Sequence, residues 1–192
     1  MSAEGKIWIA LLRGINVGGH NKLPMAELRE LFTGVGCVNV RTYIQSGNVV
    51  FKATDADRGE LADRLASVIE DAKGFRPSIM LLTRDELEAA AAANPFPEAT
   101  SEPKTLHLWF LSQAPEAPDL ETLDKLSTAT ERYELLGAVL YLWAPDGIAR
   151  SKLAARAERT VGVEGTARNW RTVEKLRELV SEVASSEPPD PA

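Results

Sequence analysis

Hydrophobic spacing in the first part of the chain alternates between the periods of strands and helices. Residues 6–13 are apolar on both faces, as in a buried strand, and a helical pattern follows Pro24, a residue suited to a first helical turn. Residues 38–45 alternate between two faces, as in a strand, and residues 48–52 are expected to form the returning strand, with a Ser46-Gly47 turn between the two. The alternation places four residues on one face, namely Val38, Val40, Thr42 and Ile44. These segments predict a strand, a helix and a β-hairpin.

Two capping signals mark the helices that follow. Asp57 with Glu60 is typical of a helix start, as is Thr83 with Glu86, and a strand is expected at residues 77–82. The second half is then predicted to contain, in order, a strand at 105–111, a helix at 119–129, strands at 131–136 and 138–144, and helices at 151–159 and 173–183.

The order of these elements predicts an α+β fold of two ferredoxin-like subdomains packed together. Residues 1–83 have the full order β-α-β-β-α-β. Residues 84–183 are expected to form a variant, β-α-β-β-α-α, in which the last strand is replaced or lost. Residues 184–192 are rich in Pro, Ser and acidic residues and are predicted to be disordered.

Three of the predicted strands, at 6–13, 105–111 and 138–144, are apolar on both faces. A sheet with one solvated face alternates instead, so both faces are expected to be covered, for example by one half packing on the other. This disfavours an exposed aromatic platform for RNA.

Composition narrows the class of protein without naming a chemistry. Of 192 residues, 44% are hydrophobic and 26% charged, and no apolar run approaches the ~18 residues of a membrane helix. The N-terminus lacks the apolar core of a signal peptide, and the single cysteine, Cys37, can form no internal disulfide. We therefore expect a cytoplasmic protein without a membrane partner, in which Cys37 is a small buried residue rather than a reactive thiol.

The net charge of −6 disfavours nucleic acid as a partner, but the charges are unevenly distributed. Residues 1–52 contain six basic and three acidic groups, residues 53–147 contain eight and eighteen, and residues 148–180 contain eight and four. If the two basic ends meet in the fold, an acidic protein has a basic patch.

Three polar segments are candidates for a ligand site. The first directly follows the first strand and contains Arg13, Asn16, Gly18 and Gly19. Its glycines would let the backbone approach an anion, although the spacing matches neither a P-loop nor a dinucleotide-binding motif. The alternative is a Gly-rich turn whose arginine pairs with a carboxylate.

The second segment is the hairpin tip, with Gln45, Ser46 and Asn48. Turns favour Asn and Ser for backbone reasons alone, and Gln45 is harder to explain in that way.

The third segment leads into the last helix and contains Arg168, Asn169 and Arg171. Two arginines near a helix N-terminus face the positive end of the helix dipole, and a bound anion would offset that placement, because helix N-termini bind phosphate readily. The alternative is that carboxylates or solvent neutralise them. Trp170 is interpreted as a core residue.

No set of residues forms a recognisable catalytic constellation. Ser151 is expected to cap a helix rather than to act as a nucleophile with Lys152. His20 and His107 have no local acid partner, and the histidines and the cysteine show no ligand spacing for zinc. No metal and no cofactor are predicted, and the catalytic residues, if any, stay unknown.

Four motifs together are distinctive. They are ALLRGINVGG, VRTYIQSGNVVF, YLWAPDGIARSKL and GTARNWRTVEKL, in order between Ile7 and Leu179, and they resemble the bacterial domain-of-unknown-function family DUF1697. The resemblance implies an α+β protein with ferredoxin-like subdomains and implies no activity. By this resemblance, motif positions are Arg13, Gly14, Asn16, Gly18, Gly19, Ser46, Gly47, Asn48, Arg168, Asn169 and Thr172.

Three hypotheses follow. The first is a site for a small anionic, phosphorylated ligand, formed where the three polar segments converge, with arginines holding the anion. The second is a nucleic-acid-binding module, by analogy of fold alone. The third is that the motifs are structural and connect the two halves. Whether a reaction is catalysed and whether the protein is oligomeric do not follow from the sequence.

Overall fold

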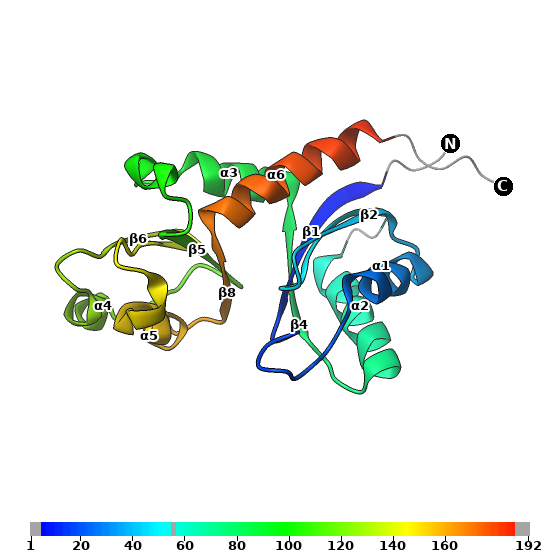
Figure 1. Ribbon diagram of the computed structural model, residues 1–192, viewed down its shortest axis with the longest axis horizontal. Helices are drawn as coiled ribbons and strands as arrows, with labels where there is room; N and C mark the ends of the chain where they lie inside the picture. The colour runs from blue at the N-terminus through cyan, green and yellow to red at the C-terminus, as the bar shows by residue number, and fades with distance from the viewer. Residues whose placement is uncertain (1–4, 55–56, 187–192) are drawn as a thin grey trace. The chain divides into compact units, whose positions relative to one another are not determined.

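The computed structural model describes residues 5–54 and 57–186. The chain divides into two compact units, one formed by the residues up to Glu88 together with those from Lys175 onward, and the other by Ala89–Glu174. The last helix, α6 (Trp170–Ser185), begins in the second unit and ends in the first (Figure 1). A domain boundary at residue 83 stays a prediction.

The first unit is built on a four-stranded antiparallel sheet in the order β2-β3-β1-β4. Its elements are β1 (Lys6–Arg13), α1 (Met25–Gly34), β2 (Val38–Tyr43), β3 (Asn48–Ala53), α2 (Arg58–Lys73), β4 (Ser78–Thr83) and the start of α3 (Arg84–Ala92). The predicted order β-α-β-β-α-β is present, with β1 in the interior of the sheet.

The core of the first unit lies between the sheet and the helices α1 and α2, which Figure 1 shows on one side of it. Trp8 and Leu12 of β1 belong to this core, and Phe32 of α1 meets Phe51 of β3 edge to face at 5.3 Å. Ile9 and Leu11, which alternate with these residues along β1, are also fully buried. The prediction that both faces of this strand are covered is therefore confirmed.

The second unit contains another four-stranded antiparallel sheet, in the order β6-β7-β5-β8. Its elements are the 3-10 turn η1 (Pro97–Ser101), β5 (Leu106–Leu111), α4 (Leu120–Leu126), β6 (Arg132–Leu136), β7 (Val139–Trp143), the 3-10 turn η2 (Ile148–Arg150), α5 (Lys152–Val161) and β8 (Gly165–Asn169). Helices α4 and α5 cover one face, where Trp109, Leu140 and Leu153 are part of the core (Figure 1).

The prediction that the second half has lost its last strand is wrong, because Gly165–Asn169 forms β8 along the free side of β5. The segment has no apolar alternation, and its strand form comes from pairing, with Phe110 opposite Thr166 and His107 opposite Asn169. A Cβ at Gly165 would lie 2.9 Å from the Phe110 carbonyl oxygen, so a larger residue would push the strands apart. Long-range pairing of this kind overrides local propensity.

The strict alternation predicted for residues 38–45 is also wrong. The register with β3 shifts between Val38 and Arg41, and Asn39 has a φ of 54°, which marks a β-bulge. Val38 is exposed, Val40 is buried, and Ile44 lies beyond the end of the strand, so the predicted common face does not form. The bulge inserts one extra residue into β2. The residues before the bulge therefore face the side of the sheet opposite to the one that strict alternation predicts.

The capping predictions are confirmed. The Asp57 carboxylate accepts a hydrogen bond from the Glu60 amide at 2.8 Å, and Ser151 Oγ accepts one from the Ala154 amide at 3.0 Å. The Thr83 amide donates to the Glu86 carboxylate at 2.8 Å, and the Glu86 amide donates to Thr83 Oγ1 at 3.2 Å. The two residues therefore form a capping box.

At the C-terminal end, α6 begins at Trp170 rather than at residue 173 and continues to Ser185. Of the tail predicted to be disordered, residues 184–192, the first two are therefore helical, and residues 187–192 lie outside the described part of the chain. Within the described residues, no helix has the length and apolar character needed to cross a bilayer.

Candidate ligand-binding site

The first polar segment folds into a small loop that closes on itself. The His20 amide donates to the Val17 carbonyl at 3.0 Å, and the two residues between them, Gly18 and Gly19, have φ values of 58° and 82°. Positive φ at both central positions is the requirement of a type I′ turn, so these two glycines are needed for the turn itself. The turn is exposed, and the backbone N–H groups of Gly18 and Gly19 donate no hydrogen bond to the described residues.

Asn16 connects this loop to the rest of the first unit. Its Nδ2 donates to the Leu23 carbonyl at 2.9 Å and to the Gln45 carbonyl at 2.8 Å, and its Oδ1 accepts from the Leu23 amide at 2.8 Å. Both amide protons and the oxygen are therefore used within the fold. Asn21 adds a bond from its Nδ2 to the Gly14 carbonyl at 2.8 Å. The first and second polar segments are thereby brought together.

The hairpin tip is held against β1. The Leu12 amide donates to the Gly47 carbonyl at 2.8 Å, and a Cβ at Gly47 would lie 2.6 Å from the Leu12 Cβ and 2.9 Å from the Ile15 Cδ1. Gly47 also has a φ of 75°. Asn48 is fully buried, and its Nδ2 donates to the Tyr43 carbonyl at 3.1 Å and to Ser46 Oγ at 2.9 Å. Gly47 and Asn48 are thus structural elements of the tip.

Exposed side chains surround the joined loop and tip. Arg13, the last residue of β1, is exposed, as are Gln45 and His20. Two apolar residues are exposed with them: Val17 has 66% of its surface accessible and Ile44 has 51%. Ile44 has a φ of 48°, which is rare for a β-branched residue and indicates backbone strain that the surrounding contacts must sustain.

Ile44 and Val17 were missed by sequence reasoning. The alternation of residues 38–45 made Ile44 an ordinary strand residue, and nothing in the local pattern signals its left-handed backbone. Asn21, which closes the base of the loop, was missed as well, although an Asn-rich loop is typical of positions with positive φ.

The third polar segment lies in the second unit, and its residues differ in their surroundings. Arg168 is on β8 rather than at a helix N-terminus and is buried. Its Nη1 donates to Thr166 Oγ1 and to the Ala167 carbonyl, each at 2.8 Å. Burial lowers the pKa of the guanidinium to about 10, because charge is disfavoured away from water.

Asn169 caps α6: its Oδ1 accepts from the Thr172 amide and from Thr172 Oγ1, each at 3.0 Å. Arg171 is in the first turn of α6 and is exposed. Trp170 is 6% exposed, which confirms that it is a core residue. Of the two arginines expected at the helix N-terminus, only Arg171 is there.

Cys37 is buried, as expected of a small apolar residue. His107 lies within β5 and is buried, and its Nδ1 has no hydrogen-bond partner among the described residues. Burial lowers its pKa to about 4. Within the described residues, no group of three or more histidines, cysteines and carboxylates is arranged to hold a metal ion.

Comparisons with known proteins give a matching family model and a similar solved structure. A family model described as "Protein of unknown function (DUF1697)" matches residues 6–141. No curated protein matches the sequence significantly. Among solved structures, a conserved bacterial protein from Streptococcus pneumoniae is similar, with 25% identity and a TM-score of 0.65, over 91% of this chain and 98% of the other. The matched region ends at Tyr141, the first residue of the third sequence motif, whereas the structural likeness covers most of the chain.

Proposed function

Since the chain belongs to the DUF1697 family, whose description assigns no function, we propose a role from its own residues: it binds a small anionic, phosphorylated ligand. The proposal rests on one observation, the hydrogen-bonded loop of residues 14–23 with the exposed Arg13 side chain beside it. We further propose that both units are ferredoxin-like, because each sheet is antiparallel with its third strand between its second and its first.

The geometry of the loop supports an anion as the ligand. Gly18 and Gly19 are exposed, their backbone N–H groups donate no hydrogen bond to the described residues, and Arg13 and His20 are exposed on the same short segment. Outward amides in left-handed turns attract anions, and an arginine adds charge-assisted hydrogen bonds to a phosphate. Because Asn16 braces the loop through three hydrogen bonds, little conformational entropy would be lost on binding.

The contacts divide the candidate residues into two groups. Asn16, Asn48 and Asn169 use their side chains within the fold, which supports the structural alternative at these three positions. In the first unit, the exposed candidates for recognition are Arg13, Gln45 and the turn amides. In the third polar segment the exposed cation is Arg171, and Arg168 and Ser46 stay as candidates.

A cytoplasmic, bacterial origin belongs to the same proposal. The lone cysteine is buried and reduced, as in a protein of a reducing compartment, and the structurally similar protein is bacterial. A nucleic acid is the competing ligand, since the first 52 residues carry a basic excess. It enters the test as a separate arm.

The test is a thermal-shift screen at low salt with inorganic phosphate, nucleotides, sugar phosphates, and short RNA and DNA. A ligand at 100 times its Kd adds about 2.7 kcal/mol, which raises Tm by roughly 5–10 °C for a chain of this size. The Arg13→Gln variant should lose the shift. The matched control is Arg84→Gln, an exposed arginine of the first unit at the start of α3, and it should keep the shift.

Two outcomes would overturn the proposal. One is a screen in which no phosphorylated compound raises Tm. The other is an equal shift in the wild type and in Arg13→Gln, which would place the ligand elsewhere. A response to RNA or DNA alone, falling steeply with salt, would favour the nucleic-acid alternative instead.

A further inference from the structure

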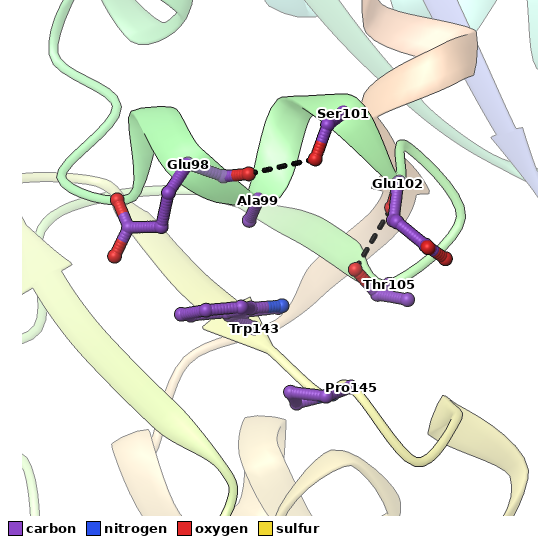
Figure 2. Close-up of a pocket in the computed structure, with 7 residues that line it drawn as sticks. All are labelled: Glu98, Ala99, Ser101, Glu102, Thr105, Trp143 and Pro145. Atoms are coloured by element: carbon purple, nitrogen blue, oxygen red, sulfur yellow. Dashed lines mark hydrogen bonds between the residues drawn. The ribbon is translucent and has the colours of Figure 1, made fainter.

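A cavity of about 260 Å³ opens in the second unit, far along the sequence from the Gly-rich loop of residues 14–23. One wall is η1, which contributes Glu98 and Ala99, and the opposite wall is the end of β7 with Trp143 and Pro145. Figure 2 shows the indole ring of Trp143 lying beneath η1, with the Ala99 side chain directed toward it. The sequence did not indicate this cavity, because η1 is a short irregular turn between the helix predicted from Thr83 and the strand predicted at 105–111.

The lining combines an aromatic surface with negative charge. The two charged residues that line the cavity, Glu98 and Glu102, are both acidic. The hydroxyl groups nearby are already engaged: Ser101 donates to the Glu98 carbonyl at 3.0 Å and Thr105 donates to the Glu102 carbonyl at 2.8 Å. The Glu102 carboxylate forms no ion pair with the described residues. Figure 2 shows the Glu98 and Glu102 side chains extending to opposite sides of the Trp143 ring, so the cavity has negative charge at both ends, which favours a cation and repels an anion.

The chain itself places a cation against this wall. Arg132, from β6, forms an ion pair with Glu98 at 2.8 Å. Its guanidinium carbon lies 4.9 Å from the centre of the Phe96 ring and 5.6 Å from the centre of the Trp143 ring. One positive group therefore already uses the carboxylate and the aromatic rings together, and the second carboxylate, Glu102, remains for another.

We propose that this cavity binds a small organic cation, an alkylammonium or guanidinium group with a short apolar body. The ammonium group pairs with Glu102 at one end of the cavity, and the apolar body lies along the Trp143 ring and contacts Ala99 and Pro145. Arg132 competes with the ligand, because its guanidinium lies at the Trp143 ring and neutralises Glu98. This site is independent of the proposed anion site in its residues and in its ligand charge.

The tryptophan residues offer a direct readout. Of the four, Trp8, Trp109 and Trp170 are at most 6% exposed, whereas Trp143 is half-buried at the cavity. The full chain, labelled with ¹⁵N, is titrated at low salt with butylamine, and with butanol and butyrate as neutral and anionic analogues of the same shape. The expected result is a saturable shift of the Trp143 indole signal with butylamine and none with butyrate.

Three variants locate the cation. Glu102→Gln should weaken butylamine binding by about threefold or more, while Glu116→Gln, the same charge change at an exposed residue outside the cavity, should leave it unchanged. Arg132→Gln should strengthen binding, because it uncovers Glu98 and the ring. If Glu102→Gln and Glu116→Gln weakened butylamine binding equally, the binding would come from the general surface charge and not from the cavity, and the proposal would be overturned. An indole shift that butanol reproduces, or Arg132→Gln binding no tighter than the wild type, would also overturn it.

Discussion

Replacing Asn16 by aspartate changes one N–H₂ group to a carboxylate oxygen at the point where the Gly-rich loop meets the hairpin tip. Aspartate has nearly the same size as asparagine and, like it, tolerates a left-handed backbone. This matters because Asn16 has a φ of 54°. The hydrogen bond accepted by Oδ1 from the Leu23 amide survives. The two donated bonds, to the carbonyls of Leu23 and Gln45, are lost, and a negative charge now faces both oxygens.

The magnitude follows from these contacts. Each lost hydrogen bond contributes about 0.5–1.5 kcal/mol, so the two together account for about 1–3 kcal/mol. Repulsion between the carboxylate and two carbonyl dipoles adds about 1 kcal/mol in this half-buried setting, at the effective dielectric of a protein surface. We expect Asn16→Asp to lower the free energy of unfolding by about 2–4 kcal/mol.

Urea denaturation followed by circular dichroism measures the loss. With an m-value of ~1–3 kcal/mol/M, the midpoint should fall by roughly 1–2 M urea. The matched control is Asn21→Asp, the same chemical change in the same loop at a φ of 51°, where one exposed hydrogen bond is lost, to the Gly14 carbonyl. That variant should lose at most about 1 kcal/mol.

Equal destabilisation of the two variants would refute the idea that Asn16 braces the loop. Hydrogen exchange provides a second, local reading. In Asn16→Asp, the Leu23 amide and the His20 amide should exchange faster than in Asn21→Asp, because the loop detaches from the tip. Unchanged exchange at both amides would mean that other contacts hold the loop in place.

Three further predictions concern single residues. Gly47→Ala should lower stability by about 2–4 kcal/mol in the same urea assay, because the new Cβ meets Leu12 at 2.6 Å and φ is 75°; a loss below that of Asn21→Asp would contradict it. Tyr141→Phe should cost about 1–3 kcal/mol, since the buried hydroxyl donates to the Ala90 carbonyl at 2.7 Å, and a neutral result would show that water replaces it. Burial lowers the pKa of His107 from 6.5 to about 4. As the pH falls, His107 is therefore protonated in the unfolded chain at a higher pH than in the folded chain. Stability should therefore drop by up to ~3 kcal/mol between about pH 6.5 and pH 4, and His107→Gln should flatten that part of the urea-midpoint profile; a parallel profile would assign the drop to other groups.

Much of the fold follows from local signals in the sequence. The strand at Lys6–Arg13 is an apolar run of strand length, and the helices that open at Asp57, Thr83 and Ser151 have side chains that cap the backbone next to them. These interactions are formed between residues a few positions apart. A pattern rule can therefore detect them without knowledge of the tertiary structure.

The errors arise where distant pairing decides the local conformation. β8 has the sequence GTARN, which resembles a loop, and it becomes a strand because β5 offers an unpaired edge more than fifty residues earlier. The bulge near Asn39 is similarly a matter of register with β3. Neither the partner strand nor its register is encoded in the segment itself.

The candidate site shows the same division. The Gly-rich loop and the Asn-containing hairpin tip could be selected from residue types, and the structure joins them within the first unit through the bond from Asn16 to the Gln45 carbonyl. Which polar groups remain for a ligand could not be predicted, because that depends on bonds such as the one from Asn48 to Tyr43. Convergence with the third segment stays a prediction.

The membership of α6 in both units has a consequence for biosynthesis. The first unit is assembled from two separate stretches of chain, and Glu88 is tied to Arg177 at 2.7 Å while Lys52 donates to the Ser186 carbonyl at 3.2 Å. As the chain leaves the ribosome, residues 5–88 appear long before the helical segment that completes them. All of Ala89–Glu174 is synthesised in the meantime and can fold in one piece. The protein thus has the layout of one domain inserted into another, in which the part made first is finished last.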